Sequence, residues 1–200
     1  MNPLKSRTGT VIAGIVLSLL LTLLLQPTTA DNAPSLTLNW LEIAVWFHVI
    51  VGITWVGLLY YFNAIQIPAV AAAIEDETPG PAAINRYIAP RALFWFRWAA
   101  ILTWLTGASA LYQMEGLLSA FTFAEGWRVL GMGAWLGTIM LFNVWFIIWP
   151  NQQKILGMKS ATPEEVARSK TIALLASRFN TMLSFPMLLG MTAFGHGLPF

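Results

Sequence analysis

Long apolar segments constrain this chain more than any other feature of its sequence. A helix needs about 20 mostly apolar residues to cross the hydrocarbon core of a membrane. Four segments reach that length, at about residues 40–66, 91–112, 127–149 and 171–194. We therefore expect an all-α integral membrane protein whose main domain is a four-transmembrane-helix bundle.

The composition supports this fold class and narrows the chemistry. The chain is 57% hydrophobic and only 10% charged, which argues against a soluble globular domain. It has no cysteine, so disulfides, zinc–thiolate sites and covalent c-type haem attachment are excluded for this sequence. The net charge of +2 comes without a basic run interleaved with aromatic residues, so we expect no nucleic-acid partner.

The N-terminal region has the form of a secretory signal. An apolar run at 11–25 follows Lys5 and Arg7 and precedes a stretch with small residues, the tripartite pattern of a cleavable signal peptide. We expect residues 1–30 to be a signal peptide, with an uncleaved N-terminal transmembrane anchor as the alternative. In both cases residues 40–200 form the four-helix membrane domain.

Lysine and arginine positions predict the orientation in the membrane. The segments 26–39 and 113–126 contain neither residue, so the positive-inside rule places both outside. The other two connections should face the cytoplasm, and the C-terminus should lie outside a bacterial inner membrane. Their basic residues are Arg86, Arg91, Lys154, Lys159, Arg168 and Lys170.

Two local patterns fit a helical bundle. Thr162, followed by Pro163 and Glu165, predicts an N-cap with a capping box at the start of the last helix. Gly133 and Gly137 lie four residues apart, share one helix face and allow a neighbouring backbone to approach closely. We find no internal repeat clear enough to use.

A histidine inside the first long span is the clearest candidate for function. His48 lies about eight residues, or about 12 Å, from the start of its span. Gly52 follows one helical turn later and leaves space beneath the imidazole. This arrangement suits haem b, whose iron takes an imidazole nitrogen as axial ligand. The alternative is a histidine that is hydrogen-bonded to a neighbouring helix, and the residues alone leave both interpretations open.

The second histidine lies at the end of the last span. His196 could be the axial ligand opposite His48, or a histidine on the surface. Arg178 precedes it by 18 residues, which is five full helical turns, so the two share one face if the helix stays regular through Pro186.

A separate polar group is expected near the cytoplasmic ends of the spans. Two arginines buried in apolar spans need anionic or acceptor partners. Haem propionates or a small anionic substrate would serve, as would backbone carbonyls or lipid phosphates. The group consists of Asn63, Arg97, Asn143, Arg178 and Asn180.

Four long motifs stand out between about Trp40 and His196. They are HVIVGITWVGLLYYFNAIQIP, PRALFWFRWAAILTWLTG, GTIMLFNVWFIIWPNQQ and RFNTMLSFPMLLGMTAFGH. Together they resemble the N-terminal membrane region of the bacterial membrane-bound urate oxidases (urate hydroxylases) of the cytochrome c-dependent type. The first motif is also distantly similar to the haem b-containing protoporphyrinogen oxidases of bacteria.

The resemblance implies urate oxidation at the membrane and electron transfer to a c-type cytochrome outside. It also strengthens the assignment of His48 and His196 as haem ligands. Longer members of the family continue into a cytochrome c domain, whereas this sequence has no cysteine, so we expect a separate cytochrome or other redox subunit as partner. Two alternatives are a non-catalytic subunit or assembly factor of a larger membrane complex, and a small-solute or proton pathway.

Overall fold

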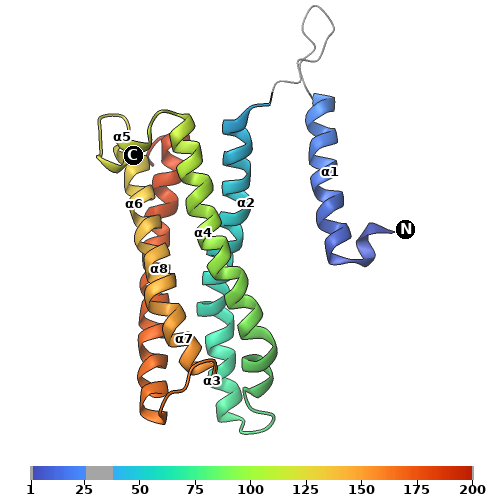
Figure 1. The fold of residues 1–200 in the computed structure, drawn as a ribbon, viewed down its shortest axis with the longest axis vertical. Helices are drawn as coiled ribbons and strands as arrows, with labels where there is room; N and C mark the ends of the chain where they lie inside the picture. The colour runs from blue at the N-terminus through green and yellow to red at the C-terminus, as the bar shows by residue number, and fades with distance from the viewer. Residues whose placement is uncertain (1, 26–37, 200) are drawn as a thin grey trace, which may run out of the picture. The chain divides into compact units, whose positions relative to one another are not determined.

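The computed structural model describes residues 2–25 and 38–199, and within them every regular element is a helix (Figure 1). The chain divides into two units, Met1–Leu38 and Asn39–Phe200. In the first unit, α1 (Arg7–Leu25) has no buried residue. The predicted cleavage after residue 30 lies outside the described residues.

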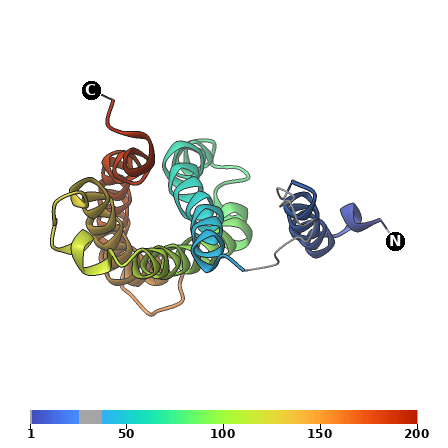
Figure 2. The same cartoon turned by 90° about the horizontal axis from the view of Figure 1, so that it is seen from above.

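The second unit contains four long helical rods, which Figure 2 shows from above. Three of them combine α-helical and π-helical segments, and a short helix lies between the second and third rods. The first rod is α2 (Trp40–Tyr61), η2 (Phe62–Gln66) and α3 (Ile67–Glu75), and the second is η3 (Ile84–Ile88) and α4 (Ala89–Gln113). The short α5 (Leu117–Phe121) precedes the third rod, which is α6 (Arg128–Phe142), η4 (Asn143–Ile148) and α7 (Trp149–Ile155), and the fourth rod is α8 (Pro163–His196).

Three of the four predicted spans form rods that are long and apolar enough to cross a membrane, and the first and fourth rods extend well beyond the predicted bounds. Within the described residues, four helical segments are long and apolar enough to cross a membrane: Arg7–Leu25, Trp40–Glu75, Arg128–Ile155 and Pro163–His196. The span predicted at 91–112 forms α4, which has 25 residues but is not among these four. Its arginines and tryptophans lower its mean hydropathy, so α4 is a less apolar helix than we expected.

Prolines shape three of the rods without ending them. A π-helical segment ends two residues before each of Pro68, Pro90 and Pro150. Proline has no N–H, and its ring clashes with the carbonyl of the preceding turn. The wider π turn relieves that clash, so the rods continue. By contrast, α8 passes through Pro186 as one α-helix, which keeps Arg178 and His196 in the register predicted for a shared face.

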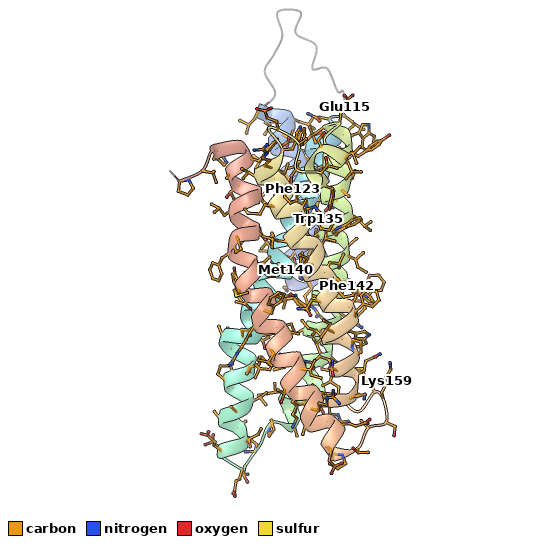
Figure 3. The ribbon with its side chains drawn as sticks, turned by 90° about the vertical axis from the view of Figure 1, so that its left-hand side faces the viewer. Glu115, Phe123, Trp135, Met140, Phe142 and Lys159 are labelled. Carbon is orange, nitrogen blue, oxygen red and sulfur yellow. The ribbon has the colours of Figure 1, made fainter. Side chains whose placement is uncertain are left out.

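The rods form two pairs, with α2 packed along α4 and α6 and α7 packed along α8. One buried apolar cluster joins residues of all four rods and includes Trp55, Leu59, Phe96, Met140 and Met187. The core therefore lies between the two pairs, and apolar side chains such as Trp135 and Phe142 remain exposed on the outside (Figure 3).

The helices of the second unit begin and end at two opposite ends of the bundle. At one end, called the Trp40 end, α2 begins, and α4 and α8 terminate (Figure 1). At the opposite end, called the Lys154 end, the predicted capping box is confirmed. The backbone N of Glu165 lies 3.2 Å from Oγ1 of Thr162, and the backbone N of Thr162 lies 3.2 Å from Oε2 of Glu165. Lys154 forms an ion pair with Glu165 at 3.6 Å.

Two similar stretches do not pack alike. WVGLLYYFN at 55–63 and WLGTIMLFN at 135–143 share Trp, Gly, Phe and Asn at matching positions. Trp55 is 2% exposed whereas Trp135 is 41% exposed, and the equivalent phenylalanines differ in the same way. The two helices therefore turn different faces to the core, and the sequence similarity is not a repeat of the packing.

Glycine allows α6 and α8 to touch. A Cβ on Gly190 would lie 2.8 Å from the backbone N of Gly133 and 2.8 Å from the carbonyl oxygen of Val129. Gly137 is also buried, but a Cβ there would meet nothing within 4 Å. Of the predicted glycine face on α6, only Gly133 therefore lies in close contact with the neighbouring backbone.

Gly190→Ala should separate α6 from α8. Its methyl group would press on backbone atoms that cannot rotate away, and overpacking of this kind costs about 1–3 kcal/mol. The free energy of unfolding in mixed detergent micelles measures the effect. Gly137→Ala is the matched control, with a methyl group in open space, and equal stability of the two variants would contradict the close contact.

Candidate functional site

His48 lies between α2 and α4, half-buried against one turn of α4. Its Nδ1 is 2.8 Å from the carbonyl oxygen of Thr103 and 3.4 Å from Oγ1 of Thr106. A carbonyl oxygen can only accept a hydrogen bond, so Nδ1 carries the proton. In the neutral ring, Nε2 then keeps its lone pair for another partner.

The residue that makes room for the imidazole is a glycine on the opposite helix. A Cβ on Gly107 would lie 2.8 Å from Cε1 and 3.0 Å from Nδ1 of His48. Gly52, which the sequence suggested for this role, faces Thr103 instead, where a Cβ would make an ordinary contact of 3.7 Å with Cγ2. Sequence reasoning missed Gly107 because its importance depends on the pairing of two helices.

His196 is the last residue of α8 and is exposed. His48, by contrast, is eight residues along α2 from Trp40, or about 12 Å. Since α2 begins and α8 ends at the Trp40 end (Figure 1), His48 lies deeper in the bundle than His196.

Polar side chains hold α2 and η2 against α8 near the middle of these rods. Nδ2 of Asn63 lies 2.8 Å from Oγ of Ser177 and 3.1 Å from Oγ1 of Thr181. One turn earlier, the Tyr60 hydroxyl lies 2.8 Å from Oγ of Ser184. Ser177 and Ser184 are both buried, so these bonds lie within the packed interface.

The same stretch of α8 holds η4. Nδ2 of Asn143 donates to Oδ1 of Asn180 at 2.7 Å and to the carbonyl of Ala176 at 2.9 Å. Nδ2 of Asn180 donates in turn to the carbonyl of Met140 at 3.0 Å. Both asparagines are buried. The structure therefore brings Asn63 of η2 and Asn143 of η4 against one segment of α8, which also carries Asn180.

The two arginines of that predicted group are placed differently. The guanidinium carbon of Arg97 lies 3.2 Å from the ring centroid of Trp149, and its Nε donates to the carbonyl of Leu93 at 3.2 Å. A cation–π contact and a backbone carbonyl thus accommodate the charge of this half-buried side chain. Arg178 is exposed rather than buried, because its face of α8 points away from the α6–α8 contact.

Comparison with known proteins supports part of the resemblance. A model of the family described as "Urate oxidase N-terminal" matches residues 116–198, which is less than half of the chain and spans α5 to α8. No curated protein and no solved structure matches the chain. The similarity to protoporphyrinogen oxidases stays a prediction. Of the candidate residues, Asn143, Arg178, Asn180 and His196 lie within the match, and His48, Gly52, Asn63 and Arg97 precede it.

Asn180→Ala should destabilise the bundle. It would remove the acceptor of Asn143 and the donor to Met140 in a fully buried position, and a lost buried hydrogen bond of this kind costs about 1–3 kcal/mol. Equilibrium unfolding in mixed micelles measures the loss. Asn151→Ala is the control, because among the described residues the Asn151 side chain donates only to the Ile147 carbonyl of its own rod. A loss no larger than that of the control would show that the asparagine pair does not hold η4 to α8.

Proposed function

We propose that this chain is a multi-pass membrane redox protein that resembles the urate oxidase N-terminal domain and binds haem b through Nε2 of His48. The observation that carries the proposal is the hydrogen bond from Nδ1 of His48 to the Thr103 carbonyl. Histidines that bind metals almost always donate their other ring N–H to a carbonyl or carboxylate, which fixes the tautomer and makes the ligand nitrogen more basic.

Gly52 lies one turn from His48, and a Cβ there would make only an ordinary contact with Thr103, so the packing of α2 on α4 does not itself require glycine at this position. We propose that the absence of a side chain at Gly52 would leave space beside a bound haem b. A bound haem b would supply one-electron transfer, and the protein would supply the ligand, its orientation and an apolar setting.

The depths of the two histidines support one protein ligand rather than two. Two histidines that hold one haem would have to lie at a common depth in the bundle, whereas His196 is exposed at the last residue of α8. We therefore propose that His48 would hold the haem and that His196 is a surface residue at the Trp40 end.

We propose that the protein is inserted in a bacterial inner membrane, with the Trp40 end outside. His48 is about 12 Å from that end, close to the surface where a c-type cytochrome or other redox subunit would dock. Arg178 is exposed and is proposed to attract a small anionic substrate such as urate, whereas the charge of Arg97 is held by Trp149.

Absorption spectra and a pyridine haemochrome assay of protein purified in detergent test the haem proposal. Wild-type protein should contain haem b, His48→Ala should lose most of it, and His196→Ala should retain it. The second variant is the matched control because it removes the other histidine of the chain. A wild-type protein without a Soret band, or a His48→Ala protein with full haem content, would refute the proposal.

A further inference from the structure

We propose that Gly107 is a positioning residue that holds the His48 imidazole with its proton on Nδ1 and with Nε2 free. The inference concerns the geometry of the histidine and stands without a bound cofactor. Only its consequence for haem binding rests on the proposed function.

The first support is the shape of the contact between α2 and α4. The atoms nearest to an added Cβ on Gly107 are Cε1, Nδ1 and Nε2 of His48, at 2.8, 3.0 and 3.7 Å. At Gly190 the corresponding neighbours are backbone atoms of α6, so that glycine serves the contact between two helices. At Gly107 the glycine serves one side chain, because the imidazole occupies the space where a Cβ would be.

The second support is the position of the acceptor. Thr103 precedes Gly107 by four residues, so its carbonyl lies one turn away on the same face of α4. One turn of α4 thus provides both the oxygen that accepts from Nδ1 and the gap that lets the ring reach it. Oγ1 of Thr106 donates to the Leu102 carbonyl at 2.7 Å, so its oxygen stays available as a weaker second acceptor for Nδ1.

A methyl group at Gly107 would act on the ring rather than on the helix. Alanine favours the helical state over glycine, so α4 should persist in Gly107→Ala. The ring would have to turn away, because its Cε1 and Nδ1 are too close to the new carbon. That movement lengthens the bond to Thr103 and removes the preference for the proton on Nδ1.

Nuclear magnetic resonance of the histidine ring nitrogens tests the inference directly. The chain has two histidines, so His196→Ala protein labelled with ¹⁵N in the histidine rings reports on His48 alone. In haem-free protein at a pH where the ring is neutral, the parent should show the Nδ1–H tautomer. Gly107→Ala should show a mixture of tautomers or mainly Nε2–H.

Gly57→Ala is the matched control, because an added Cβ on Gly57 meets nothing within 4 Å. It should give the spectrum of the parent. A Gly107→Ala protein with the parental tautomer would overturn the inference. Equal unfolding midpoints of parent and Gly107→Ala would show that the change of tautomer is not caused by a general loss of structure. An unfolded Gly107→Ala protein would overturn the claim that the glycine serves the His48 side chain alone.

Haem titration separates this inference from the proposed function. If the parent binds haem b through His48, Gly107→Ala should bind it about 10–100-fold more weakly, as for other losses of a partner that orients a metal ligand. A changed tautomer in a protein that never binds haem would support the role of Gly107 and refute the haem proposal. If the parent binds haem b and Gly107→Ala keeps both its tautomer and its haem affinity, the role of Gly107 would be refuted and the haem proposal would stand.

Discussion

The rest of the bundle depends on a row of polar side chains on α8 that bonds to helices from both pairs. Asn63 reaches Ser177 across 114 residues of sequence, and Asn143 bonds to Asn180 from the other side. In an apolar environment these amides have no water to replace their partners, so each bond also penalises the alternative packings that would leave it unmade. This row fixes α2 and η4 on the same helix and so sets how the two pairs meet around the core.

With the middle of the bundle held in this way, the site nearer the Trp40 end depends on the contact between α2 and α4. His48 takes no part in the polar row and is instead oriented by Thr103 and by the gap at Gly107. The two neighbourhoods have different chemistry. The amides and hydroxyls on α8 are largely occupied by one another, whereas Nε2 of His48 is a nitrogen with a lone pair that is not needed for packing. This difference is why we place the proposed cofactor at His48 rather than among the asparagines.

Much of the fold was predictable from the sequence because its signals are local. Apolar length predicted the rods, and Thr162 with Glu165 predicted the start of α8. The candidate histidine was also found, since any polar residue in an apolar span is unusual.

What sequence could not provide was the pairing across helices: that Arg97 stacks on Trp149, that Arg178 is exposed, and that Gly107 rather than Gly52 faces the imidazole. Each of these depends on how one helix is rotated against another, and periodicity within a single helix does not determine that rotation. The low hydropathy of α4, by contrast, follows from the arginines and tryptophans in its sequence.

We propose above all that His48 binds the iron of haem b, through its Nε2. Pulsed electron paramagnetic resonance of oxidised, haem-loaded protein, with ¹⁵N in the histidine rings and His196 replaced by alanine, tests this proposal most directly. We expect strong hyperfine coupling between the iron and one directly bound histidine nitrogen. Haem-loaded protein without that coupling would contradict it, because the iron would then be held by a group other than His48.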